Sequence, residues 1–324
     1  MKRKKAMTRI FWGFKIPTLR EFWGLLKDTG SEFIDDRGIK FSAALSYYTI
    51  FSIPPLLIII IRVAGIVWGQ DAIEGQIYAQ IQGLVGKEAA ITVQETIQAT
   101  VLDSNSWWAT TISVIALLFG ATGVFAEIQD SINIIWGLKA KPKKGLIKLV
   151  VNRLVSFSMI ITIGFLLTVS LTLNAILDIF NMHLQRIFPD VAFYAFYVFN
   201  LILLISIITF MFATIFKILP DAKISWRVVL FGAFFTSILF MIGKVLISLY
   251  LGNSDVGTAY GAAGSVIIIL VWVYYSSMIL FFGAEFTQVY ADKFAKGIEP
   301  NDYAVFIEVK EKEIPNPNNE LNPA

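Results

Sequence analysis

The sequence predicts an all-α, polytopic membrane protein with six transmembrane helices. The 324 residues are 56% hydrophobic and only 16% charged, with a mean hydropathy of +0.68. Soluble domains are roughly 45–50% apolar and about 25% charged. The apolar residues lie in blocks of about 20 residues or more, the length that spans a hydrocarbon core of roughly 30 Å. Both observations favour a membrane protein over a large soluble one.

Six segments are long and apolar enough to span a bilayer. They cover 41–68, 105–126 (with an extension toward 136), 150–177, 191–216, 227–251 and 258–284. The first contains one charge, Arg62. The fifth contains Lys244 besides Arg227, which flanks it at its first residue.

Lysine and arginine residues gather in alternate connections between these spans. Residues 1–40, 137–153, 217–227 and 286–324 hold 23 of the 27 cations. Because cation-rich connections stay in the cytoplasm, both termini are expected there. The predicted location is the cytoplasmic membrane, crossed several times.

The N-terminal segment 1–40 is basic and lacks a signal-peptide cleavage site. From Thr18, apolar side chains alternate with charges as in a helix that lies in the membrane interface. Its expected purpose is to anchor the first span, the alternative being a role in sensing lipid or a partner.

Two further segments flank or interrupt the transmembrane domain, which is assigned to 41–290. Residues 71–104 show two amphipathic periods separated by Gly83–Gly86 and predict a helical hairpin on the outer face. Residues 291–324 end in a Pro- and Asn-rich polar stretch and are expected to form an unstructured tail.

Paired prolines interrupt the first span. Pro54 and Pro55 have no amide hydrogen, so the carbonyls of Ile50 and Phe51 lose their helical partners. In lipid this is tolerated only beside protein, hydroxyl groups or water. The functional interpretation is a discontinuous helix whose second half begins in the membrane; the structural alternative is a packing kink.

Polar side chains precede this break. Ser46, Thr49 and Ser52 are placed to supply hydroxyls to the freed carbonyls. Tyr47 and Tyr48 lie on neighbouring faces and are candidate substrate-binding residues.

Arg62 and Lys244 lie at similar depth near the outer ends of their spans. Charged residues in a span are costly and often functional, so the pair is a candidate site for an anionic group. The alternative is that both side chains snorkel to lipid headgroups.

Three carboxylates form a candidate inner acidic cluster: Glu127, Asp130 and Glu285. They can relay protons, or they can pair with interfacial lysines and arginines.

Small residues in the sixth span favour close helix packing. Gly257 and Gly261 form a GxxxG motif, and Gly264 follows. A hinge is the alternative function of these glycines.

The sequence contains little that could support catalysis. It has no cysteine and one histidine, His183, in a predicted outer loop. Zinc-dependent nucleases need clustered His and Asp ligands, and a phosphate-binding P-loop is absent from "GATGVFAE". We therefore expect no enzymatic activity, no catalytic residues, no metal, no cofactor and no nucleic-acid partner.

Two stretches carry a family resemblance: "DDRGIKFSAALSYYTIFSIPPLL" and "YGAAGSVIIILVWVYYSSMILFFGAEFTQVYA". Together with the layout of residues 25–295 they resemble the YihY/BrkB family of bacterial inner-membrane proteins. This resemblance implies about six helices in the cytoplasmic membrane and no firmly assigned activity. Members have been called ribonucleases or virulence factors, and some have been proposed to move lipids.

The leading hypothesis is a membrane protein that binds or translocates a lipidic or anionic substrate. Membrane lipids and an anionic or lipid-linked substrate are the expected partners, and the sequence does not determine an oligomeric state. The alternative is a scaffold or envelope-integrity protein, associated with virulence, that acts through partner proteins without transport.

Overall fold

The fold is mostly helical in a computed structural model of the chain, which describes residues 17–52, 123–141, 189–252 and 264–307, with Gly75, Tyr78, Ile91 and Gln94. The labelled helices are α1 (Leu19–Asp35), α7 (Pro189–Ile218), α8 (Trp226–Gly252) and α10 (Gly264–Phe294). Residues 38–52 and 123–135 are also helical. The strands are β1 (Leu138–Ala140), β2 (Ala222–Lys223), β3 (Glu299–Pro300) and β4 (Ala304–Phe306).

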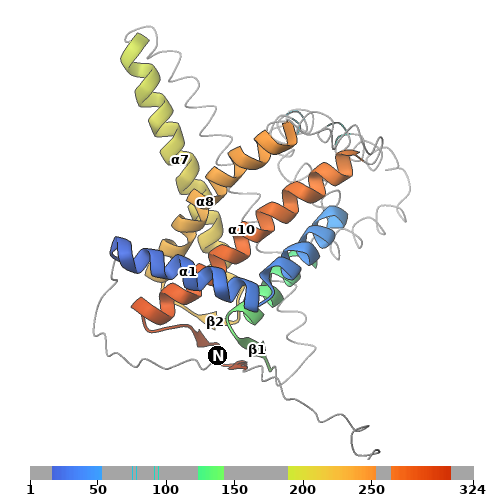
Figure 1. Cartoon of the computed structure of the whole chain (residues 1–324), viewed down its shortest axis with the longest axis vertical. Helices are drawn as coiled ribbons and strands as arrows, with labels where there is room; N and C mark the ends of the chain where they lie inside the picture. Colours follow the sequence, from blue (N-terminus) through green and yellow to red (C-terminus); the bar gives the residue numbers. More distant parts are fainter. Residues whose placement is uncertain are drawn as a thin grey trace, which may run out of the picture.

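Helices α8 and α10 lie side by side and form the centre of the described structure (Figure 1). Helix α7 packs on α8 near the strands and diverges from it toward its own N-terminus, while α1 crosses α10. In the part of the chain that the structure describes, three segments are long and apolar enough to cross a membrane: Val198–Ile218, Trp226–Ile247 and Val266–Phe294. They agree with the fourth, fifth and sixth predicted spans, although α10 continues about ten residues beyond the predicted end at 284.

Helix α1 begins where the sequence places an interfacial helix. Thr18 and Glu21 form a capping box, in which the Thr18 amide donates to Glu21 Oε2 at 2.8 Å and the Glu21 amide donates to Thr18 Oγ1 at 3.4 Å. Leu25 on one face is fully buried, while Trp23 on another is 73% exposed. The helix therefore packs against protein with one side and leaves an aromatic side chain free for the interface.

Four short strands tie together segments that are far apart in the sequence. β1 pairs antiparallel with β4, and β2 pairs antiparallel with β3. We call the end of the helices formed by residues 136–141, 219–225 and 295–307 the strand end. The expectation of an all-α chain is incomplete at these strands, and an unstructured tail beginning at 291 is wrong up to residue 307.

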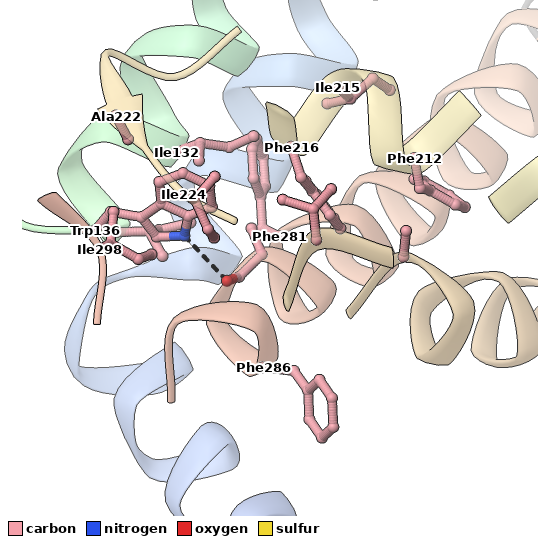
Figure 2. Packing of buried hydrophobic residues seen from close by; sticks show 14 of the residues in the cluster. Ile132, Trp136, Phe212, Ile215, Phe216, Ala222, Ile224, Phe281, Phe286 and Ile298 are labelled. Carbon is pink, nitrogen blue, oxygen red and sulfur yellow. Dashed lines mark hydrogen bonds between the residues drawn. The ribbon is translucent and has the colours of Figure 1, made fainter. Parts of the chain in front are cut away.

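A glycine allows the helix at 123–135 to end and turn into β1. Gly137 has a φ of 65°, which favours glycine, and its amide donates to the Ile134 carbonyl at 2.9 Å. Before it, Trp136 is 1% exposed and its indole Nε1 donates to the Ala284 carbonyl of α10 at 3.0 Å (Figure 2). This bond fixes the helix end against α10.

The hydrophobic core of the described residues lies largely near the strand end. Its largest fully buried side chains include the aromatic residues Trp136, Phe216, Phe281 and Phe286, which are labelled in Figure 2. Tyr290 of α10 is also fully buried. Apolar side chains on α7, such as Phe199 and Ile202, are more than half exposed. The helices are therefore tightly packed near the strand end, and the apolar faces farther along α7 are suited to contact with lipid.

Reciprocal contacts between glycine and threonine hold α8 and α10 close together. A Cβ added at Gly283 would lie 2.0 Å from Thr236 Oγ1, and a Cβ added at Gly232 would lie 2.0 Å from Thr287 Oγ1. Small residues allow two backbones to approach in this way. The sequence predicted such packing for Gly257, Gly261 and Gly264 and did not point to these two glycines.

Candidate cationic pocket at the strand end

A pocket of about 690 Å³ opens at the strand end of the helices. Four cationic side chains from different elements line it: Lys217, Lys223, Arg227 and Lys296. The carboxylate of Glu299 and the polar residues Ser225, Tyr290 and Asn301 also contribute. Such a cavity favours an anionic ligand because its cations outnumber its carboxylate.

The four cations differ in whether they already have a hydrogen-bonding or ion-pairing partner within the protein. Lys217 Nζ donates to the Ile224 carbonyl at 2.5 Å and lies 5.8 Å from the centre of the Trp226 ring. Lys223 pairs with Asp302 at 2.5 Å. Within the described ranges, Arg227 and Lys296 take part in neither of the ion pairs found, which are Lys223–Asp302 and Lys293–Asp28.

The Lys223–Asp302 pair lies in solvent at the edge of the pocket. The hydrogen bond from Lys223, followed by its charge, lowers the pKa of Asp302, and the same partner raises the pKa of Lys223. Both groups are exposed, so this pair contributes little to stability. Its effect here is to neutralise one of the four cations.

A buried carboxylate holds the wall of the pocket in place. Asp221 is 2% exposed and accepts hydrogen bonds from Gln129 Nε2 at 3.2 Å and Asn133 Nδ2 at 3.0 Å. The Asp221 amide donates in return to Asn133 Oδ1 at 2.8 Å. We call these three residues the Asp221 cluster; it joins helix 123–135 to the turn between α7 and β2.

The C-terminal segment is attached to the same cluster. The Asn301 amide donates to the Asp221 carbonyl at 3.0 Å, and the Tyr303 side chain hydrogen-bonds to Asp221. Burial, followed by the charge of Asp221, raises the pKa of Tyr303. The cluster therefore positions Asn301 and neighbouring Glu299, both of which line the pocket.

Several residues singled out in the sequence lie outside the described residues, and their predictions stay untested. They are Pro54, Pro55, Arg62, Gly257 and Gly261. The hairpin at 71–104 is described only at Gly75, Tyr78, Ile91 and Gln94, and the span at 150–177 not at all.

The other candidates for substrate binding are described individually. Lys244 is half-buried on α8. Gly264, predicted for helix packing rather than for substrate binding, is buried at the start of α10. Tyr47 and Tyr48 are exposed, with ring centroids 6.0 Å apart. The structure does not link any of these side chains to the cationic pocket.

The hydroxyls before the proline pair do not serve the carbonyls for which they were expected. Ser46, Thr49 and Ser52 instead donate to the carbonyls of residues 43, 45 and 48, at 2.8, 2.7 and 2.9 Å. A hydroxyl has one proton to donate, and the preceding helical turn is the nearest acceptor. This part of the prediction is wrong for the described helix.

The three carboxylates of the inner acidic cluster have different surroundings. Asp130 is exposed, Glu127 is half-buried and accepts from Ser131 Oγ at 3.5 Å, and Glu285 is fully buried in α10. Among the described residues, no group of three or more His, Asp or Glu side chains is placed to hold a metal ion.

Sequence reasoning missed both the pocket and the Asp221 cluster. Asp221 lies in the short connection "LPDAKIS" with no motif around it, and its partners are 88 and 92 residues away. The one available signal was the group of cations at 217–227, which served only to assign orientation.

The chain is similar to several bacterial membrane proteins. It is 28% identical to a UPF0761 membrane protein of Psychromonas ingrahamii, over 80% of this chain and 84% of the relative. It is 25% identical to YfkH of Bacillus subtilis, named a ribonuclease-like protein, over 80% of this chain and 92% of the relative. A UPF0761 membrane protein of Azotobacter vinelandii is 26% identical over 82% of this chain but only 62% of its own length.

No solved structure matches the fold. The model of the family described as virulence factor BrkB matches residues 29–304, which is most of the chain and includes all of α7, α8 and α10. The two UPF0761 relatives are named as membrane proteins, and their names specify no molecular activity. On this match, the chain is a membrane protein that belongs to the BrkB family.

Proposed function

We propose that the protein spans the bacterial cytoplasmic membrane six times, binds an anionic lipidic substrate and moves it across the bilayer. The observation that supports this most directly is the pocket lined by four cations at one end of three membrane-length helices. Basic pockets between helices on the cytoplasmic side are suited to lipid headgroups. In this proposal Arg62 and Lys244 attract the same charge nearer the outer face.

Transport is tested with purified protein in vesicles that contain a fluorescent anionic lipid or its zwitterionic counterpart. We expect the anionic lipid to move between leaflets faster than in protein-free vesicles. Arg62→Ala and Lys244→Ala should each slow this movement by about tenfold, as expected for the loss of about 1.4 kcal/mol of interaction with the moving charge. Lys139→Ala is the matched control, because Lys139 is exposed on β1 and does not line the pocket.

Each outcome of the vesicle experiment has a distinct meaning. Unchanged rates in Arg62→Ala and Lys244→Ala would remove these residues from the mechanism. Equal rates with and without the wild-type protein would refute transport and favour the scaffold alternative.

The proposed orientation puts the strand end in the cytoplasm. Because the chain has no cysteine, a single introduced cysteine can be labelled without background. We expect a membrane-impermeant maleimide to label Lys87→Cys in intact cells and Lys139→Cys only after permeabilisation. The reverse pattern would show that the orientation is wrong.

A further inference from the structure

We propose that the cationic pocket binds a phosphate group that carries two negative charges, as in the phosphomonoester headgroup of a lipid. This inference rests on the proposed function for its lipidic ligand, and it adds the headgroup chemistry and the residues that hold it.

The charges around the pocket indicate a dianion. Asp302 already pairs with Lys223, which leaves Lys217, Arg227 and Lys296 facing the single carboxylate of Glu299. The excess is two positive charges. A phosphodiester has one negative charge, whereas a phosphomonoester has about −1.5 to −2 at pH 7. The monoester therefore matches the pocket more closely.

The side chains also suit phosphate geometry. The guanidinium of Arg227 can donate two parallel hydrogen bonds to phosphate oxygens. The ammonium groups of Lys217 and Lys296, which belong to different segments, supply point charges, and Lys217 retains two donors besides the one that it gives to the Ile224 carbonyl. Ser225 and Asn301 add neutral polar groups to the lining.

An exposed apolar stripe on α8 favours a lipid as the source of this phosphate. Trp226, Leu230, Phe234 and Ile238 recur every four residues and are between 38 and 48% exposed. Residues four apart lie on the same side of a helix. The stripe begins at Trp226, whose ring lies beneath Lys217 of the pocket. An acyl chain can follow the stripe while its headgroup occupies the pocket.

The ligand itself should give binding a dependence on pH. The charged and titratable groups that line the pocket are Lys217, Lys223, Arg227, Tyr290, Lys296 and Glu299. Histidine is the side chain that titrates between pH 5 and 8, and among the described residues none lines the pocket. A phosphomonoester loses its second proton near pH 6, so its affinity should rise between about pH 5 and about pH 8.

The test measures lipid binding to the full-length protein in detergent by native mass spectrometry. The probes are dioleoyl phosphatidic acid, a monoester, and dioleoyl phosphatidylglycerol, an anionic diester. We expect tighter binding of phosphatidic acid. Arg227→Gln and Lys296→Gln should each weaken it about tenfold through the loss of a charge-assisted contact, whereas the charge-matched control Lys139→Gln should retain it. Unfolding temperatures from tryptophan fluorescence verify that the variants remain folded.

Other results would overturn the proposal. Equal binding of the two lipids, or equal losses in all three variants, would refute a dianion site at Arg227 and Lys296. Sodium pyrophosphate in molar excess distinguishes the source: retained lipid supports a lipid headgroup, and complete displacement refutes it in favour of a soluble phosphate. Binding that depends on Arg227 without lipid movement in vesicles would refute transport alone.

Discussion

Replacing Asp221 with alanine is expected to lower the free energy of unfolding by about 2–6 kcal/mol. The substitution leaves the buried amides of Gln129 and Asn133 without the acceptor that they share. Each buried donor left unsatisfied costs about 1–3 kcal/mol, which is the basis of this range. The measurement is thermal or denaturant unfolding of the detergent-solubilised protein, followed by tryptophan fluorescence.

Asp302→Ala is the matched control for Asp221→Ala. It removes the same side chain from the same end of the protein, but the carboxylate of Asp302 is exposed. We expect little change in stability, and Asp221→Asn should lie between the two because its amide keeps one acceptor oxygen. Equal stability of Asp221→Ala and Asp302→Ala would show that the Asp221 cluster does not hold the strand end together.

Alanine at Gly283 is the second substitution from which we expect a large effect. The added Cβ would lie 2.0 Å from Thr236 Oγ1 and 2.6 Å from Thr236 Cγ2, so rotating the threonine replaces one clash by another. Overpacking of this kind costs about 1–3 kcal/mol. In the interior of a helix, alanine is intrinsically more favourable than glycine by roughly 1 kcal/mol. Helix propensity alone would therefore make Gly283→Ala stabilising, so a loss of stability would have to come from packing.

Two companion variants separate packing from helix propensity at Gly283. Gly30→Ala adds a methyl group on α1 where nothing lies within 4 Å, and it should be neutral or slightly stabilising. Thr236→Gly combined with Gly283→Ala moves the side-chain volume from one helix to the other and should recover part of the loss. A stable Gly283→Ala protein would contradict the close approach of α8 and α10.

The sequence was sufficient for the helices whose apolar length determines them. Helices α7, α8 and α10 lie close to their predicted ranges, because a continuous apolar block that spans a bilayer must satisfy its backbone internally. The end of α10 was placed too early at 284. Glu285, Thr287 and Gln288 look like the start of an interface, but all three side chains are buried, and Thr287 lies against Gly232 of α8.

The pocket and its support could not be read from the sequence because they depend on contacts between distant segments. Nothing local distinguishes Asp221 from an ordinary turn aspartate, and Gly232 and Gly283 belong to no GxxxG motif. The role of Asp221 becomes visible only when helix 123–135, the turn after α7 and the C-terminal segment meet. The roles of Gly232 and Gly283 become visible only when α8 packs on α10. Pattern-based reasoning favoured Gly257 and Gly261, where the small residues are adjacent in sequence.

The pairing of β3 with β2 and of β4 with β1 has a consequence for biogenesis. Ribosomes synthesise Lys296, Glu299 and Asn301 after α7, α8 and α10, and these three residues line the pocket. A nascent chain can therefore insert its helices into the membrane before its cationic pocket is complete. The pocket is complete only after β4 has been synthesised and has paired with β1. The ribosome makes β1 more than 160 residues before β4.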